Sequence, residues 1–576
     1  MKIVSRIYRK TVLATVVALG ALMSSCTDYL TIIPADKVVE ENFWQTKDQV
    51  NGMLATSYLK LLSSDAVSKA IIWGELRSDN MTYQTNYTTD IKNIVEANTT
   101  DENGFCNWGV FYEAINYANL VLESAPQVVE RDPDFTEGDL DIVMGEMYAM
   151  RALSHFYVLR AFRDIPLAMK SAKNDSEIPE YKQAGNPLEA LDLIMEDLNR
   201  AESLVMKSGA FPSREQNCGR ITRNAVLAIK ADVNLWRAAF ATYYAGTEYN
   251  LVYSEGTAYV QPGLSQVYYD ECVQNCSTVI ANMDKALEEE AEKSNKPIEE
   301  VPYNLIQNEG DENEKKTNHI STAYDEIFGT KNSKESILEL QVLNQDEGKF
   351  AHGALNVYGT EGKAGYVVVP QNFMSNYTED DLRKYSFTNF SENNKQNVLV
   401  AKYSAKNAPA NNYRTSDNWD ANWILYRRTD VLLMMAEAMV TRENATELDF
   451  REAYDIVKAI NFRSRVDTLT MDLTPWKVEK YLTQESAIEL VRKERLLELS
   501  YEGKRWFDLV RQALREGDTK NIKFVAEKLD ESAVVMSKMS TIDALFLPIH
   551  IDELRYNKNL KQNPAYDKEN SSTEMN

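Results

Sequence analysis

Residues 485–511 read ESAIELVRKERLLELSYEGKRWFDLVR, and the fold of this chain is best predicted from this stretch. At about 100° per residue, a helix through it carries apolar side chains on two sides. Leu490 and Leu497 lie on one side, while Ile488 and Leu499 lie on the opposite side. Because a helix that is apolar on two sides packs between neighbours, the stretch predicts a helical protein that encloses this segment.

The charged residues of the stretch are expected to support the helix. Arg495 and Glu498 stand three residues apart, a spacing at which opposite charges can neutralise each other on one flank. The alternative is that Glu494 and Glu498 form an acid and base pair for catalysis, which requires a cleft and a side that faces substrate. Gly503 is expected to loosen the helix before residues 505–511, where two large aromatic rings stand among charges.

This segment resembles the C-terminal signature of the SusD/RagB family, the surface glycan- and nutrient-binding lipoproteins of Bacteroidetes-type bacteria. The family pattern is roughly E-R-x-x-E-L-x-x-E-G-x-R-W-x-D-L-x-R. The positions that match it are Glu494, Arg495, Glu498, Leu499, Glu502, Gly503, Arg505, Trp506, Asp508, Leu509 and Arg511. The resemblance implies a mainly α fold, a tetratricopeptide-like solenoid of helix pairs with an irregular loop-rich insertion and few short strands.

Composition agrees with a large helical protein. The chain has 576 residues with only 22 glycines and 15 prolines, but 31 tyrosines that can place amphipathic rings at the surface. Its 87 acidic residues outnumber 63 basic ones, for a net charge of −24. A body this acidic repels phosphate backbones, so the sequence predicts no nucleic-acid partner.

The N-terminus predicts export. Basic residues from Lys2 to Lys10 precede a short apolar run, and Ser24 and Ser25 stand directly before Cys26. This order resembles a lipoprotein signal peptide at residues 1–25, with lipidation of Cys26 and a tether at residues 26–42 that keeps the family pattern C-x-D-Y-L-x-x-x-P. An ordinary secretory signal with an incidental cysteine is the alternative.

Helical periodicity divides the remainder of the chain. Helix pairs are expected at 107–123 with 144–161, at 187–204 with 220–241, and at 423–441 with 450–463, with another helix at 268–283. We predict an N-terminal helical region at 43–335, an irregular ligand-rim insertion at 336–422 and a C-terminal SusD/RagB helical region at 423–576. The acidic stretch 284–317 is expected to be a solvated loop.

No catalytic, metal or cofactor motif is apparent. The chain has no P-loop, no dinucleotide-binding glycine pattern, no H-E-x-x-H and no G-x-S-x-G, and its four histidines are scattered. We therefore predict no cofactor, no metal and no enzymatic activity, with a calcium site in residues 308–313 (NEGDEN) as a lesser alternative. The cysteines after Cys26, which are Cys106, Cys218, Cys272 and Cys276, are expected to be buried thiols.

Ligand contacts are expected where aromatic rings stand beside amides and carboxylates in irregular segments. A sugar presents a C–H face that stacks on a ring and hydroxyls that need polar partners. Trp419 is the strongest candidate, while Trp108 and Trp423 are expected in the core. The candidate ligand-binding residues are Asn80, Tyr83, Tyr87, Tyr366, Tyr413, Asp417 and Trp419.

The resemblance implies a non-catalytic, lipid-anchored outer-membrane protein that faces the cell exterior. It would capture an oligosaccharide and pass it to a SusC-like TonB-dependent barrel. A peptide-binding RagB-like lipoprotein, a surface glycan hydrolase and a structural tetratricopeptide adaptor are the alternatives.

Overall fold

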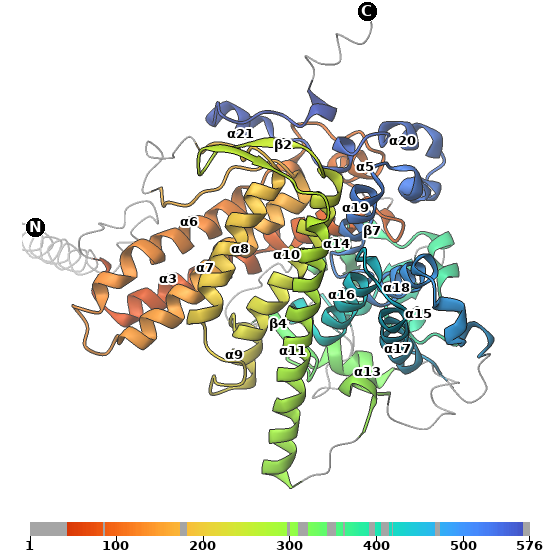
Figure 1. The fold of residues 1–576 in the computed structure, drawn as a ribbon, viewed down its shortest axis with the longest axis horizontal. Coiled ribbons are helices and arrows are strands. Elements are labelled where there is room, and N and C mark those ends of the chain that lie inside the picture. The colour runs from red at the N-terminus through yellow and green to blue at the C-terminus, as the bar shows by residue number, and fades with distance from the viewer. Residues whose placement is uncertain are drawn as a thin grey trace, which may run out of the picture.

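The computed structural model describes residues 43–84, 87–172, 181–295, 300–308, 321–342, 353–360, 363–390, 398–404, 414–416, 419–466 and 473–567 (Figure 1). The signal peptide, the tether and Cys26 lie outside these ranges, as do residues 309–313 of the suggested calcium site. Within the described residues, no helix is both long enough and apolar enough to cross a bilayer.

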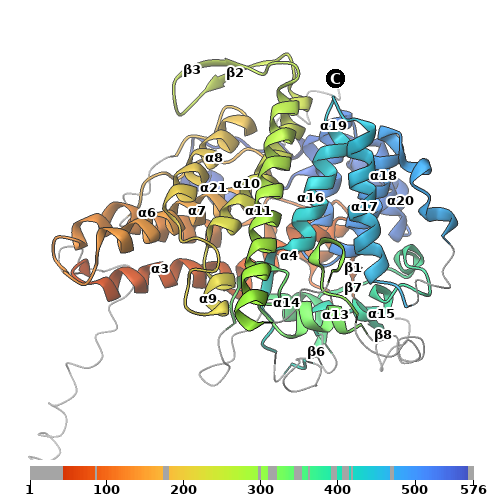
Figure 2. The same ribbon diagram turned by 60° about the horizontal axis from the view of Figure 1, so that its bottom comes forward.

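Helices dominate the fold and stack in chain order, as predicted. Each long helix packs against the next, and α10 and α11 lie between the N-terminal and C-terminal groups (Figures 1 and 2). The helices in this series are α3 (Lys47–Leu62), α6 (Gly109–Ser124), α7 (Glu137–Phe162), α8 (Pro187–Leu204), α10 (Arg223–Tyr243), α11 (Leu264–Ser294), α16 (Arg428–Thr441), α17 (Glu447–Arg463) and α18 (Gln484–Leu499).

Shorter elements fill the spaces around this stack. Every sheet in the described residues is a single antiparallel pair of strands. The strands are β1 (Thr82–Tyr83) with β7 (Val367–Val368), β2 (Glu248–Leu251) with β3 (Gly256–Tyr259), β4 (Ser336–Leu340) with β10 (Trp423–Arg427), β5 (Gly359–Thr360) with β6 (Lys363–Ala364), and β8 (Thr388–Phe390) with β9 (Val398–Val400). In Figure 2 the β2–β3 hairpin projects beyond α8.

The remaining described helices are short. They are α4 (Ser64–Ile71), α5 (Thr89–Val95), α9 (Arg214–Gly219), α13 (Thr322–Tyr324), α14 (Gly353–Tyr358), α15 (Arg383–Ser386), α19 (Arg505–Glu516), α20 (Ser532–Lys538) and α21 (Ile551–Tyr556). Three further short helices are the π-helical η2 (Ile72–Leu76) and the 3-10 helices η9 (Gln371–Asn376) and η13 (Lys520–Lys528).

Local sequence explains where several long helices begin. Thr46, Thr136, Thr446 and Thr483 each precede a helix, and the residue three positions later returns a side-chain hydrogen bond to the backbone N–H of the threonine. This reciprocal arrangement satisfies N–H groups that have no partner within the helix. Four helices of the stack therefore begin at a threonine that the sequence alone marks.

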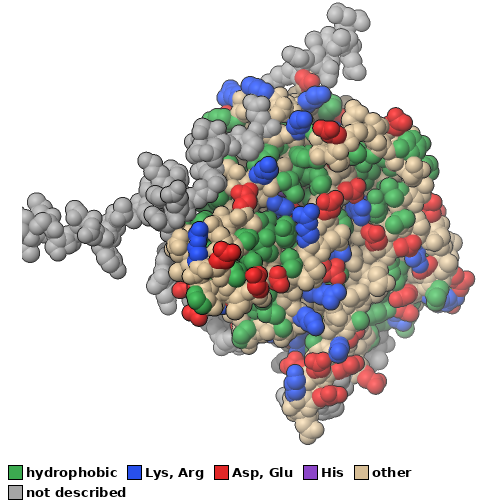
Figure 3. Space-filling model, turned by 60° about the vertical axis from the view of Figure 1, so that its left-hand side comes forward, with side chains coloured by type: hydrophobic (Ala, Val, Ile, Leu, Met, Phe, Trp, Pro, Cys, Tyr) green, Lys and Arg blue, Asp and Glu red, His purple; other side chains and the backbone are tan. Residues whose placement is uncertain are grey.

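Two expected boundaries were wrong. The helix α11 continues to Ser294, so the first part of the acidic stretch is helical rather than a loop. Glutamate, lysine and alanine are good helix formers, and no proline or glycine interrupts them. The projecting end of α11 carries clustered acidic side chains at the bottom of Figure 3. Residues 423–427 form strand β10, so the following helix α16 begins at Arg428.

The signature stretch is two helices separated by a bend. Gly503 has a φ of +75°, and a Cβ built on Gly74 would lie 1.9 Å from its carbonyl oxygen. The backbone of η2 therefore crosses the backbone at Gly503 at a distance that a side chain at position 74 would not permit, while the positive φ favours glycine at position 503. The expected loosening at Gly503 is thus a sharp turn between α18 and α19.

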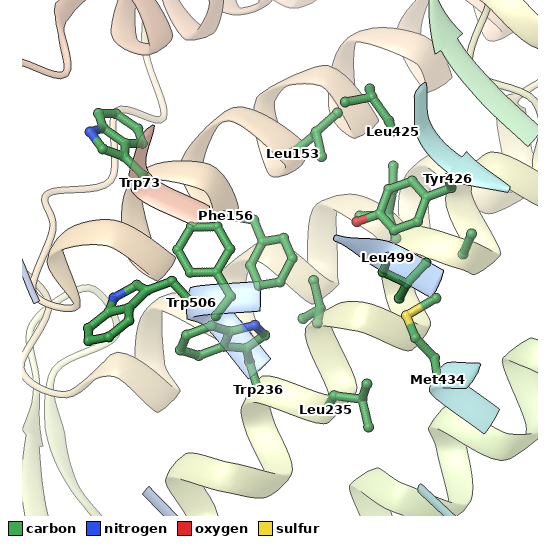
Figure 4. Packing of buried hydrophobic residues seen from close by; sticks show 14 of the residues in the cluster. Trp73, Leu153, Phe156, Leu235, Trp236, Leu425, Tyr426, Met434, Leu499 and Trp506 are labelled. Atoms are coloured by element: carbon green, nitrogen blue, oxygen red, sulfur yellow. The ribbon is translucent and has the colours of Figure 1, made fainter. Parts of the chain in front are cut away.

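The core joins both ends of the chain. Figure 4 shows Trp73 of η2, Phe156 of α7, Trp236 of α10 and Trp506 of α19 in one apolar cluster. The rings of Trp236 and Phe507 meet edge to face, with centroids 6.0 Å apart. Cys106, Cys218, Cys272 and Cys276 are buried free thiols, as expected.

Candidate functional site

The charged residues of the signature are enclosed rather than exposed on the flanks of a helix. Glu498 has no exposed surface, and its carboxylate accepts hydrogen bonds from Arg427 (3.0 Å), Arg463 (2.6 Å) and Arg383 (3.2 Å). Burial alone would raise the pKa of Glu498, but these guanidinium groups hold it well below its ordinary value. Glu494 is also buried and accepts a 2.6 Å bond from Arg383. Neither carboxylate faces a cleft, so the geometry that a catalytic pair requires is missing here.

The predicted pairing of Arg495 with Glu498 was wrong. Arg495 donates instead to Asp508 of α19 at 2.9 and 2.8 Å and lies 3.2 Å from Glu437 of α16. Glu498 instead accepts hydrogen bonds from Arg427, Arg463 and Arg383, which lie on other elements. A buried charge needs a partner close by, here on neighbouring elements. An ion pair on an exposed helix face is screened by water and contributes little to stability. We call the network of Glu498, Glu494, Glu502, Arg383, Arg427, Arg463 and Lys402 the buried ion cluster.

Residues 77–84 connect this interior to the surface. Lys528 of η13 donates to the carbonyls of Leu76 (3.0 Å), Met81 (2.5 Å) and Ser78. Asn80 donates to Glu75 at 2.5 Å, and Glu75 also accepts the backbone N–H of Gly503 at 2.9 Å. The segment is therefore fixed by buried hydrogen bonds up to the point where it reaches the surface at Tyr83.

Strand β1 then brings together candidates that are far apart in sequence. Tyr83 pairs with Val367 of β7, and the backbone N–H of Gln84 donates to the carbonyl of Tyr366 at 3.1 Å. Tyr366 is partly buried against the core. The ladder of two residue pairs thus places Tyr366 beside Tyr83, although some 280 residues separate them in the chain.

Tyr83 and Tyr87 form a small aromatic platform. Their ring centroids are 4.8 Å apart with an interplanar angle of 65°, and Tyr87 is 38% exposed. The Tyr83 hydroxyl donates to Glu96 at 3.0 Å, Lys92 lies 3.7 Å from Glu96, and the Lys92 ammonium lies 5.6 Å from the Tyr87 ring centroid. Partial burial and the bond to Glu96 raise the pKa of Tyr83 to about 12. We call Tyr83, Tyr87, Tyr366, Lys92 and Glu96 the tyrosine rim.

The rim offers the contacts that a neutral sugar needs. Tyr87 presents an open ring face for the C–H face of a pyranose. Tyr83 stays protonated at physiological pH, and its hydroxyl, which donates to Glu96, can accept a hydrogen bond from a ligand, while Glu96 accepts and Lys92 donates. Apolar stacking and hydroxyl partners are therefore available within one small surface.

The structure separates the other candidates. Asn80 has no exposed surface, and Trp419 is only 4% exposed, so neither side chain reaches solvent in this arrangement. Tyr413 and Asp417 lie outside the described residues. Contact of ligand with any of these residues stays a prediction, and the described positions favour Tyr83 and Tyr87. Trp108 and Trp423 are buried, as expected.

Aromatic residues of the insertion pack inward. The hydroxyl of Tyr358 donates to the carbonyl of Tyr501 at 2.7 Å, and that of Tyr377 donates to the carbonyl of Leu497 at 3.1 Å. Both rings are buried, although they lie in the segment 336–422 that was expected to form a ligand rim. They satisfy carbonyls at the C-terminal end of α18, which have no partner within the helix.

Sequence reasoning missed Lys92 and Glu96. They stand four residues apart directly after the tyrosine-bearing loop, on the helical segment that begins at Thr89. That spacing marks a pair on one helix face, so a polar pair adjoining Tyr87 could have been inferred.

Comparison with known proteins places the chain in context. Residues 288–566 match the model of the SusD family, and residues 28–235 match a model described as starch-binding associating with outer membrane. SusD-like protein P38 of Formosa agariphila is 25% identical over 569 residues, which cover 96% of this chain and 97% of that protein. SusD-like protein P2 of the same organism is 23% identical over 519 residues, which cover 87% of this chain and 90% of that protein.

Solved structures share the fold. A SusD homolog from Bacteroides thetaiotaomicron superposes with a TM-score of 0.67 at 18% identity, covering 92% of this chain and 98% of that one. A SusD superfamily protein from Parabacteroides distasonis gives a TM-score of 0.62 at 21% identity, covering 90% of this chain and 99% of that one.

Proposed function

The chain belongs to the SusD family, and from this premise we propose that it is a non-catalytic, outer-membrane-associated protein that binds a glycan at the tyrosine rim. The observation that carries the proposal is the platform of Tyr83 and Tyr87, an open ring beside a hydroxyl, a carboxylate and an ammonium group. A net charge of −24 favours neutral glycans over polyanionic ones.

Binding is tested with a panel of purified oligosaccharides and extended peptides. We expect micromolar to millimolar affinity for at least one neutral oligosaccharide, none for the peptides, and recovery of the ligand intact by chromatography. Preferential binding of peptides would favour a RagB-like cargo. Release of shorter products would identify a hydrolase, and absence of any small-ligand binding would favour a structural adaptor.

We also propose that Cys26 is lipidated and holds the protein at the outer membrane, facing the cell exterior. Small residues precede this cysteine, and a short apolar run precedes them. Several acyl chains on one residue would anchor a protein that one chain alone holds only marginally. Replacement of Cys26 by alanine should abolish incorporation of labelled fatty acid and release the protein from the membrane fraction. Unchanged labelling would contradict the anchor.

The partner that we propose is a SusC-like TonB-dependent barrel, which would receive the captured glycan. Family membership supports this pairing. Mild solubilisation of outer membranes followed by affinity capture of this protein should recover such a barrel as the main companion. Recovery of the protein alone, under conditions that keep other outer-membrane complexes together, would contradict the pairing.

A further inference from the structure

A second hollow lies on the signature helices, apart from the tyrosine rim. It has a volume of about 1130 Å³ and is formed by side chains from α18, α19, η9 and η13, with Asp79 at one edge. Small-molecule sites usually enclose about 300–1,000 Å³, so this hollow has room for part of an oligosaccharide. A smaller hollow of about 430 Å³, between α11 and residues 300–304, has no aromatic residue in its lining.

A polar group centred on Glu516 occupies one wall. Its carboxylate accepts hydrogen bonds from Gln512 (3.0 Å), Asn521 (2.9 Å) and Arg492 (3.4 Å). The bond from Arg492 is long, and within the described parts of the chain the buried Nε of Arg492 donates to no acceptor. A planar carboxylate therefore stands beside two amides and a guanidinium that it holds by only one long bond.

An open ring stands next to this group. Phe524 is 38% exposed and follows Asn521 by three residues in the 3-10 helix η13. A 3-10 helix has three residues per turn, so both side chains lie on one side of it. An apolar ring at the surface beside paired amides and a carboxylate matches the two faces of a pyranose, one made of C–H groups and one edged by hydroxyls.

The charges of the hollow disfavour an anionic ligand. Arg505 donates to Asp79 at 2.9 Å, and Arg515 donates to Glu437 at 2.9 Å, so both are already neutralised. Glu485, Glu489 and Glu527 also line the hollow. A phosphate or sulfate would meet this acidic excess, whereas a neutral hydroxyl can bond to carboxylates and guanidinium alike.

We propose that this hollow is a second carbohydrate subsite, in which Phe524 stacks on a neutral pyranose while Glu516, Arg492 and Asn521 bind its hydroxyls. The proposal rests on the proposed glycan-binding function and adds a second point of attachment to it. Asp79 and Tyr83 are four residues apart, at most about 14 Å of extended chain. A ligand of several sugar units could therefore contact both subsites, and it would bind more tightly than a short one.

The test compares short and long ligands. Wild-type protein, Phe524→Ala, Glu516→Gln and Tyr83→Ala are titrated with maltotriose and maltoheptaose and with galactan and xylan oligosaccharides of matching lengths. We expect Phe524→Ala and Glu516→Gln to weaken binding of the longer ligand about five- to tenfold, with little change for the shorter ligand held at the rim. Tyr83→Ala should weaken both. Tyr556→Ala, an 81% exposed ring on α21, is the matched control and should change neither.

The outcomes separate the two proposals. If Phe524→Ala and Glu516→Gln bind long ligands as the wild type does while Tyr83→Ala loses affinity, the second subsite is overturned and the rim stands. If wild-type protein binds none of these ligands, both proposals are overturned. Melting curves check that each variant is folded. We expect Phe524→Ala and Glu516→Gln to fold, because both residues lie at the surface.

Discussion

The buried ion cluster and the tyrosine rim use polar side chains in opposite ways. In the cluster, the carboxylates of Glu498 and Glu502 are fully enclosed by arginine and lysine from other elements. In the rim, Tyr87 is 38% exposed and contacts the Tyr83 ring, and the Lys92 and Glu96 beside it form a loose pair at 3.7 Å. The cluster can stabilise the fold but is not accessible to a ligand. The rim is accessible to a ligand but does not hold the fold together.

The difference explains why the buried carboxylates of the signature do not themselves meet a ligand. The signature positions Glu494, Glu498 and Glu502 each bind a cation from a segment at least 35 residues away in the chain. Leaving any one of these charges buried without its partner is costly. These carboxylates therefore join distant segments, and the tyrosine rim depends on them only indirectly.

The largest expected effect comes from Arg427→Met. It leaves Glu498 and Glu502 buried with fewer partners, so the free energy of unfolding should fall by about 3–5 kcal/mol. Urea denaturation measures this change. Arg451→Met removes an exposed pair with Glu447 and should cost less than about 1 kcal/mol. Equal losses of unfolding free energy in the two variants would contradict the expected difference between buried and surface ion pairs.

Acid should weaken the cluster next. Burial alone would raise the pKa of Glu502, but Arg427 and Lys402 hold it at about 2. The carboxylate thus stabilises the fold by about 3 kcal/mol above its ordinary pKa of about 4.3. That contribution should be lost as pH falls from about 4.3 through about 2. Denaturation midpoints measured across this window should fall more steeply for the wild type than for Glu502→Gln, and parallel profiles would contradict the assignment.

Gly74→Ala should affect both regions. The added Cβ would lie 1.9 Å from the carbonyl oxygen of Gly503, and relief of this overlap should cost about 1–3 kcal/mol. The same shift displaces the segment that carries Tyr83, so glycan affinity should also fall. Gly52→Ala, in α3 with no atom within 4 Å of its Cβ, is the control. It should stabilise the protein by about 0.5–1 kcal/mol, and a loss of similar size in both variants would contradict the crossing.

Tyr87→Ala should have the smallest effect on stability and a clear effect on binding. The ring is already partly in solvent, so unfolding free energy should change by less than about 1 kcal/mol, while glycan affinity falls about five- to tenfold. Titration calorimetry and a melting curve measure the two quantities. Tyr259→Ala, a 45% exposed ring on the β2–β3 hairpin, should alter neither. If both variants lose affinity alike, binding is spread over the surface and not centred on the rim.

Much of the fold was predictable from the sequence. Helical periodicity placed most long helices, and the match at residues 494–511 predicted the family. The sequence could not show that Arg495 and Glu498 bind other partners, because local spacing permits the pair while contacts with distant segments decide against it. Trp419 and Asn80 were similarly indistinguishable from exposed residues, since loop composition does not reveal what covers a side chain.

The candidate site was predictable only in part. Tyr83, Tyr87 and Tyr366 were identified as residue types, but the approach of Tyr366 to the other two depends on a ladder of two residue pairs. A ladder this short has no periodic signal in the sequence. Phe524 and Glu516 gave no signal either, because their role depends on a hollow between α18, α19 and η13.

Glycan binding at the tyrosine rim is tested most directly by titration calorimetry of the double variant Tyr83→Ala/Tyr87→Ala beside the wild type. The titrant is the neutral oligosaccharide that the wild type binds best, and the ligand is recovered and analysed afterwards. We expect the double variant to lose affinity at least about tenfold. Its acid denaturation profile should match that of the wild type, because the buried ion cluster is unchanged, and the ligand should be recovered intact. Equal affinity of the two proteins, or cleavage of the ligand by the purified wild type, would contradict the proposal.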